Sequence, residues 1–136
     1  MSDSTSVLRE VIERGFGAGH LSIADRAAGA TIIEHEYLAP VGATGAETLR
    51  AMINEARAEM PGMTMTVEDT AVDGYKVLAR SVARAIHPAT GDEVMLTVFD
   101  LCRFEDGRIV EHWGVPDRFA LLHQIGALPP RPAGTA

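Results

Sequence analysis

Near the start of the chain, apolar residues recur every three or four positions: Val7, Leu8, Val11, Ile12 and Phe16. This spacing predicts an amphipathic helix over about residues 4–17. Two further helices are predicted, a short one over 22–28 and a longer one over 44–60. Each follows a sequence of the capping-box type, Ser-x-x-Asp or Thr-x-x-Glu. Residues 31–37 alternate between apolar and polar and predict a strand.

After residue 62 the pattern changes to one typical of strands. Four are predicted, over residues 63–72, 75–87, 93–104 and 108–115, separated by turn sequences such as Asp-Gly. A short helix is predicted over 118–126. Helices grouped early and strands grouped late indicate an α+β fold. We expect the three helices of the N-terminal half to pack on one face of a curved antiparallel sheet.

The length of 136 residues corresponds to one domain. We expect this domain to span residues 1–128. Residues 129–136 contain three prolines, which disfavour helices and central strands, and are expected to form a disordered tail.

The formal net charge is −7, with 19 acidic and 12 basic residues. Because binding to nucleic acid or to an anionic membrane requires clustered basic residues, neither partner is expected. The single cysteine excludes an intramolecular disulfide, and the scattered histidines lack the spacing of a metal site. No apolar run reaches the ~20 residues of a membrane span. We therefore expect a soluble cytoplasmic protein without a metal or other cofactor.

The C-terminal third carries the string FEDGRIVEHW over residues 104–113, then Asp117, then Gln-Ile-Gly over 124–126. This string resembles the R-F-x-D-G-[KR]-I-x-E-x-W-x-x-x-D pattern of SnoaL-like polyketide cyclases, members of the nuclear transport factor 2-like superfamily. The resemblance covers about residues 5–128. It implies a cone-shaped α+β barrel with a strongly bent sheet and a pocket at its wide end. It also implies a homodimer formed through the outer sheet face.

Asp117 is the first candidate catalytic residue. It matches the aspartate of the W-x-x-x-D motif, which in SnoaL-like cyclases serves as general acid and base. A carboxylate at the mouth of an apolar pocket is poorly solvated, so its pKa rises toward the working pH and it can transfer a proton. The alternative role is structural, because Asp is a favoured N-cap and the predicted helix begins at the next residue.

Asp100 is the second candidate. It lies in the middle of a predicted strand among apolar neighbours, where Asp is disfavoured. The F-D-x-x-R-F string around it resembles the strand that carries the oxyanion-stabilising aspartic acid of ketosteroid isomerases. An acid kept protonated in an apolar site donates a hydrogen bond to a developing enolate. The alternative is a solvent-facing Asp paired with a cross-strand Arg.

The neighbours of Asp100 depend on the register of the last hairpin. A two-residue loop at Asp106-Gly107 places Asp100 opposite Trp113. A three-residue loop with a glycine bulge places it opposite His112 and creates an Asp–His pair. Because a slip of one residue moves every side chain to the other face, the sequence leaves both registers open.

Five further residues complete the predicted site. His35 and Tyr37 share one face of the first strand, and the family often has a polar residue at this point in its pocket. His87 ends a strand whose residues on one face are small, which leaves room for a ligand or for closely packed helices. We predict that Tyr37, His87, His112 and Trp113 bind the substrate and that His35 acts with the two aspartates.

The resemblance implies a small cofactor-independent enzyme acting on a hydrophobic carbonyl compound. Its most concrete form is a polyketide cyclase that closes a ring by an intramolecular aldol-type reaction. In this hypothesis Asp117 removes the α-proton, while Asp100, with His35 or His112, polarises the carbonyl.

Two alternatives stay open. One is epoxide hydrolysis or ketosteroid-isomerase-like proton transfer on the same fold. Epoxide hydrolases of this fold use an Asp–Arg–Asp set, which is disfavoured because Arg103 and Asp100 point to opposite faces of a regular strand. The other alternative is a non-catalytic module that binds small molecules.

Overall fold

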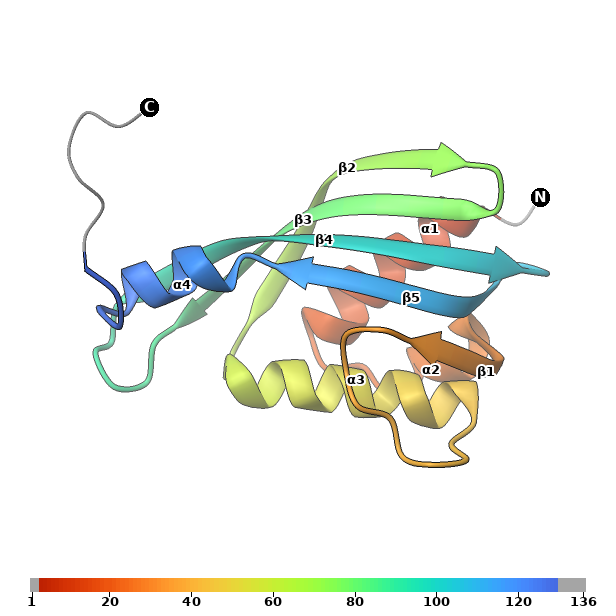
Figure 1. Ribbon diagram of the computed structural model, residues 1–136, viewed down its shortest axis with the longest axis horizontal. Helices are drawn as coiled ribbons and strands as arrows, with labels where there is room; N and C mark the ends of the chain where they lie inside the picture. Colours follow the sequence, from red (N-terminus) through yellow and green to blue (C-terminus); the bar gives the residue numbers. More distant parts are fainter. Residues whose placement is uncertain (1–2, 130–136) are drawn as a thin grey trace.

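The computed structural model describes residues 3–129, which form an α+β fold (Figure 1). In chain order the elements are α1 (Ser4–Glu10), the π-helix η1 (Val11–Phe16), α2 (Ile23–Ala27), β1 (Ala28–Glu34), α3 (Gly45–Glu59), β2 (Thr64–Asp73), β3 (Lys76–Ile86), β4 (Glu93–Glu105), β5 (Arg108–Pro116) and α4 (Arg118–Gln124). The predicted order of elements is confirmed. The tail predicted for residues 129–136 lies outside the described residues, apart from Pro129.

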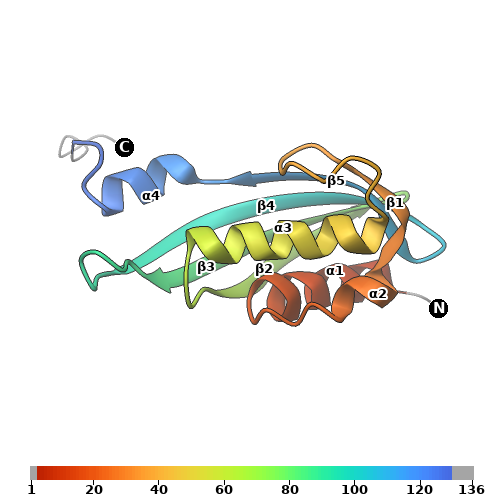
Figure 2. The ribbon, with the colours of Figure 1, turned by 90° about the horizontal axis from the view of Figure 1, so that it is seen from below.

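The five strands form one sheet in the order β1-β5-β4-β3-β2. All neighbouring strands are antiparallel except β1, which runs parallel to β5, so the prediction of a wholly antiparallel sheet is wrong at this edge. The reason is that α3 separates β1 from β2 in the chain, which lets β1 join the far edge of the sheet. The expected cone-shaped barrel with a strongly bent sheet is not observed. The sheet is twisted and gently bent, and it stays open because β1 and β2 are its two edges and do not pair with each other (Figure 2).

The helices α1, α2 and α3 cover one face of the sheet, and the main apolar core lies between them and the strands (Figure 2). The inner face of β3 carries small, buried side chains at Ala79, Ser81, Ala83 and Ala85. These small residues let the helices approach closely and leave space for a pocket beside them. No helix within residues 3–129 is both long and apolar enough to cross a membrane.

The predicted caps differ in outcome. At the start of α3 the capping box is confirmed, because Glu47 N donates to Thr44 Oγ1 at 3.1 Å and Thr44 N donates to Glu47 Oε1 at 2.8 Å. Ser22 precedes α2 as predicted, but its side chain makes no capping hydrogen bond. Its backbone has helical angles, whereas a capping residue is normally extended.

The last hairpin adopts neither predicted register, because Asp100 pairs with Gly114 and not with Trp113 or His112. The loop is the two-residue turn Asp106-Gly107, with both residues at positive φ. A bulge follows at Val110, which shifts the pairing by one residue. Asp100 therefore pairs with Gly114, and its side chain lies on the same face of the sheet as that of His112.

Candidate active site

Three ionisable side chains meet between the helices and the sheet. His112 on β5 lies between two carboxylates: its Nε2 is 2.7 Å from Asp100 Oδ1 and its Nδ1 is 2.7 Å from Glu34 Oε1. The side chains are almost fully buried, with exposed fractions of 1% for Glu34, 6% for His112 and 13% for Asp100. We call these three residues the triad. One predicted register implied an Asp–His pair. The pair is present, but it forms through the bulge at Val110 and not through a three-residue loop.

A glycine makes room for the triad. Gly114 pairs with Asp100 across the two strands, and a Cβ at this position would lie 2.9 Å from His112 Cε1 and 3.0 Å from Asp100 Oδ1. Both distances are shorter than ordinary van der Waals contacts. The missing side chain thus allows the imidazole to reach the carboxylate diagonally across the hairpin.

Glu34, the last residue of β1, was not among the predicted site residues. Its Oε2 accepts hydrogen bonds from the backbone N–H groups of Glu36 and Tyr37, at 2.8 and 2.9 Å. The predicted strand continued to residue 37, with His35 and Tyr37 sharing one face. The chain instead turns at Glu34, so the period-two rule no longer holds beyond it. A carboxylate at the end of an apolar strand is the only signal that the sequence offers.

The environment of His112 favours the imidazolium. Burial alone would lower the pKa of His112, but the hydrogen bonds to Asp100 and Glu34, together with their negative charges, outweigh it and raise the pKa from 6.5 to about 9. At neutral pH the triad therefore contains one imidazolium between two carboxylates. Among residues 3–129, no group of His, Cys, Asp and Glu side chains is arranged to hold a metal ion.

Asp100 also lines a pocket of about 160 Å³. The walls come mainly from apolar side chains of α3, α4 and the sheet, among them Met60, Met63, Met65, Leu96, Val98 and Leu121. Tyr37, one of the residues predicted to bind the substrate, lines the same pocket. Burial raises the pKa of Tyr37, and the charge of Asp100 raises it further, so its phenol stays protonated. The pocket thus combines apolar walls with a carboxylate and a phenol.

Charged residues surround the rim of this pocket. Arg118, at the start of α4, donates a hydrogen bond to Glu36 at 2.8 Å and lies 3.8 Å from Glu59 at the end of α3. Both Arg118 and Glu59 line the pocket. These ion pairs connect α4 and the loop after β1 to α3 around the opening.

Asp117 lies outside the pocket lining. It is exposed and forms the N-cap of α4, accepting a hydrogen bond from Ala120 N at 3.0 Å. This position corresponds to the structural alternative considered for Asp117. A catalytic role for this residue stays a prediction.

His35 and Trp113 lie together on the opposite side of the sheet from the pocket. Their rings stack with centroids 4.7 Å apart, and Lys76 lies 5.6 Å from the indole. Glu111 accepts hydrogen bonds from His35 and Arg103, at 2.8 and 2.9 Å. Arg103 therefore points away from Asp100, as expected for residues three apart on a strand.

His87 is also distant from the triad. It begins the turn between β3 and β4, where its Nδ1 lies 3.4 Å from Thr90 Oγ1. The structure therefore brings Asp100, His112 and Tyr37 together and leaves the other four predicted residues, Asp117, His35, His87 and Trp113, outside the pocket lining.

Replacing Gly114 with alanine should disrupt the triad. The added Cβ would force His112 and Asp100 apart, because both lie within about 3 Å of it. We expect the pKa of His112, followed by NMR titration, to fall from about 9 toward its ordinary value. Overpacking of this kind costs about 1–3 kcal/mol of stability. Val115→Ala, on the exposed outer face, is the matched control, and an unchanged pKa in Gly114→Ala would contradict the role assigned to the glycine.

Comparison with known proteins matches most of the chain to one family: residues 6–125 fit the model of the SnoaL-like polyketide cyclases. The chain belongs to the SnoaL-like polyketide cyclase family. Among curated proteins, no sequence matches it significantly.

Solved structures agree with membership of the SnoaL-like family. IdmH of Streptomyces antibioticus, a proposed polyketide cyclase, has 27% identity and a TM-score of 0.76, over 91% of this chain and 99% of its own. TsrD of Streptomyces laurentii has 26% identity and a TM-score of 0.74, over 92% and 96%. AclR of Streptomyces galilaeus, a proposed hydroxylase, has 21% identity and a TM-score of 0.77, over 98% and 91%, and shows the fold alone. The predicted resemblance is thereby confirmed.

Proposed function

We propose that this SnoaL-like protein is a cofactor-independent acid/base enzyme acting on a neutral, hydrophobic carbonyl compound. Its most concrete activity is that of a polyketide cyclase, which closes a ring by an intramolecular aldol-type reaction. The observation that carries the proposal is the position of Asp100. Its carboxylate lies at the wall of an apolar pocket and is held by a buried imidazolium, which fixes it for proton transfer.

In the proposed reaction, Asp100 removes a proton from the carbon next to a carbonyl, and the resulting enolate attacks a second carbonyl of the same molecule. A carbon–carbon bond forms, and the new alkoxide takes the proton back from Asp100. Tyr37, which keeps its phenolic proton, donates a hydrogen bond to the enolate oxygen. No proton is gained or lost over the cycle. The apolar walls hold the chain folded for attack, and such positioning lowers the barrier substantially.

The geometry favours this reaction over epoxide hydrolysis by an Asp–Arg–Asp set. Such a set needs an arginine beside the catalytic carboxylate, whereas Arg103 pairs with Glu105 and Glu111 on the other face of the sheet. Arg118 lines the pocket, but its guanidinium is already paired with Glu36. A binding module without catalysis is the remaining alternative.

Proton exchange in D₂O tests the proposal without knowledge of the natural substrate. The probe is phenylacetone, a neutral ketone with one six-membered ring and with acidic protons next to its carbonyl. The protein should accelerate exchange of these protons, followed by NMR, above the rate in buffer. Binding of phenylacetone without accelerated exchange would contradict the enzymatic proposal and favour the binding module.

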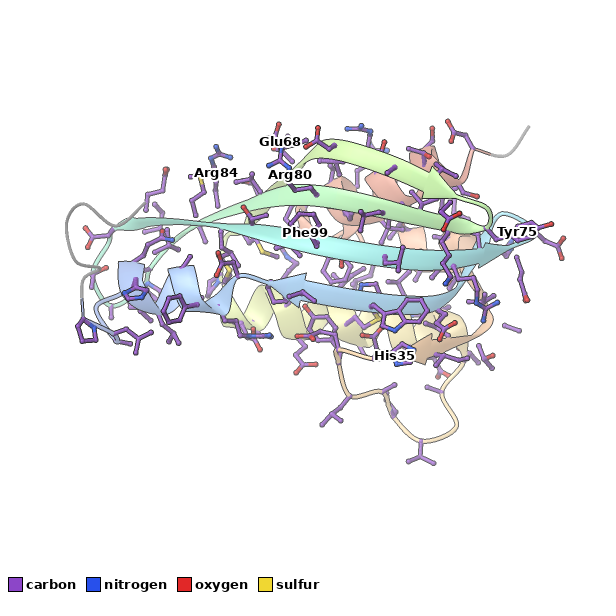
Figure 3. All side chains as sticks on the ribbon, turned by 45° about the horizontal axis from the view of Figure 1, so that its top comes forward. His35, Glu68, Tyr75, Arg80, Arg84 and Phe99 are labelled. Carbon is purple, nitrogen blue, oxygen red and sulfur yellow. The ribbon has the colours of Figure 1, made fainter. Side chains whose placement is uncertain are left out.

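We further propose that two copies associate through the outer face of the sheet. No described element covers this face, and Figure 3 shows Arg80, Arg84 and Phe99 on it. The exposed apolar side chains there include those of Met95, Phe99 (45% exposed) and Val115 (68% exposed). Apolar side chains gathered on an uncovered sheet face are typical of a protein interface.

The substitution Phe99→Glu should dissociate this dimer. It removes an aromatic side chain that the interface would bury and puts a charge in its place, and loss of such an aromatic anchor weakens association by about 2 kcal/mol or more, which is at least about 30-fold. Sedimentation equilibrium measures the change. Val41→Glu, which adds the same charge at an exposed loop position, should leave the dimer intact. A monomeric wild-type protein at high concentration would refute the assembly.

A further inference from the structure

A second, smaller cavity lies behind the pocket. Its volume is about 10 Å³, and its walls include His112 together with apolar side chains of the helical core such as Ile12 and Met52. Among residues 3–129, only Phe16 and Asp100 line both this inner cavity and the outer pocket. These two side chains therefore form the partition between the two spaces.

Phe16 is fixed in this partition by its backbone. It is the last residue of the π-helix η1. Helices of this type are rare in proteins, and those that occur are often found at functional sites. Glycines flank Phe16 on both sides: a Cβ at Gly15 would lie 3.1 Å from Ile53 on α3, and one at Gly17 would lie 2.9 Å from Met65 N on β2. Residues 15–17 are thus closely packed between α3 and the sheet. This close approach places the aromatic ring beside Tyr37, with ring centroids 6.5 Å apart.

The volumes show what the partition does. A cavity of about 150 Å³ holds a benzene molecule, so the outer pocket of about 160 Å³ accepts roughly one six-membered ring beside Asp100. The inner cavity is close to the smallest volume that holds one water molecule, about 10–15 Å³, and admits no part of a larger ligand. Asp100 is fixed by His112, whereas no hydrogen bond restrains the Phe16 ring. The Phe16 ring therefore sets the depth of the pocket.

We propose that Phe16 is a specificity-determining residue that limits the ligand portion bound beside Asp100 to about one ring. The inference rests on the proposed function in one respect, namely that the ligand is a neutral, hydrophobic carbonyl compound. Removing the Phe16 ring joins the two cavities and lets a second ring pass toward the helical core. Enlarging the side chain makes the pocket shallower.

Two aryl methyl ketones test this proposal. Acetophenone has one ring and 2-acetonaphthone has two fused rings, so the pair differs by one ring alone. Affinities are measured by titration calorimetry with wild type, Phe16→Ala and Phe16→Trp. We expect Phe16→Ala to raise the affinity for 2-acetonaphthone relative to acetophenone at least tenfold, which corresponds to about 1.4 kcal/mol. Phe16→Trp should shift the ratio in the opposite direction.

Phe16→Leu is included because it keeps more of the core packing; it should shift the ratio in the same direction as Phe16→Ala, by less. Tyr75→Ala, which removes an aromatic ring from the exposed turn between β2 and β3, should leave the ratio unchanged. Equal ratios in wild type and every folded Phe16 variant would overturn the proposal, as would an equal loss of affinity for both ketones.

This test is independent of catalysis. A changed ratio without any acceleration of phenylacetone exchange would leave the role of Phe16 standing and refute the enzymatic proposal. An unchanged ratio in a protein that accelerates exchange would refute the role of Phe16 and leave the enzymatic proposal standing. Asp100→Asn provides the complementary variant, because it should alter exchange while the dependence on ring number persists.

Discussion

The substitution Asp100→Asn should reduce phenylacetone exchange about 100-fold or more. An amide cannot take the α-proton, and a positioned general base contributes about 10²–10⁴-fold to the rate. Asparagine has nearly the same shape and still hydrogen-bonds to His112, so the variant should remain folded and bind acetophenone. NMR exchange rates and titration calorimetry separate these two effects.

Asp117→Asn is the matched control, because it makes the same chemical change at the other candidate carboxylate. Asparagine is as good an N-cap as aspartate, so α4 should persist. Asp117 is exposed and lies outside the pocket lining. Because its only role here is to cap α4, we expect the exchange rate to change by less than about threefold. The opposite result, with exchange lost in Asp117→Asn and kept in Asp100→Asn, would restore the assignment based on the W-x-x-x-D motif.

The stability of the protein should fall as the pH rises above neutrality. His112 binds its proton more tightly in the folded state, with a pKa of about 9 against 6.5 in the unfolded chain. A raised pKa contributes stability that is fully present below pH 6.5 and is lost as the pH rises through about 9. The shift corresponds to about 3 kcal/mol, because each pKa unit is worth about 1.4 kcal/mol. Urea denaturation at pH 6.5, 8 and 10 should record this loss.

His112→Gln tests the origin of the effect, since glutamine cannot titrate in this range. We expect this variant to be less stable than wild type at pH 6.5 and to lack most of the decline. His20→Gln removes an exposed histidine and should retain the full decline. A decline of equal size in wild type and His112→Gln would show that other groups cause it.

Much of the fold could be predicted because its signals are local. Helical spacing, the Thr44 capping box and the Asp-Gly turn each depend on neighbouring residues, and all three correspond to observed elements. The candidate site was less predictable because it depends on contacts between distant strands. Asp100 was identified because an aspartate in an apolar strand is unusual. The position of His112 beside Asp100 depends on a bulge at Val110, and no residue in the sequence predicts that bulge.

The errors at the first strand have the same cause. His35 was predicted to face the pocket together with Tyr37, but it follows the end of β1 and lies on the outer side of the sheet, stacked on Trp113. Its neighbour Glu34 reaches the triad instead, and a slip of one position exchanges the two faces of a strand. The W-x-x-x-D motif located the start of α4 correctly, yet a motif cannot reveal whether its aspartate faces the pocket or caps the helix.

The parallel pairing of β1 with β5 has a consequence for folding. Asp100 and His112 come from strands joined by a two-residue turn, whereas the hydrogen bond between His112 and Glu34 joins residues 78 positions apart. Closing a long loop costs more chain entropy than closing a short one, and contacts of this kind slow folding. The β4–β5 hairpin is therefore expected to form early and the edge strand β1 to dock late. Catalytic competence would then appear only in the last step of folding, when Glu34 reaches an imidazole that is already in place.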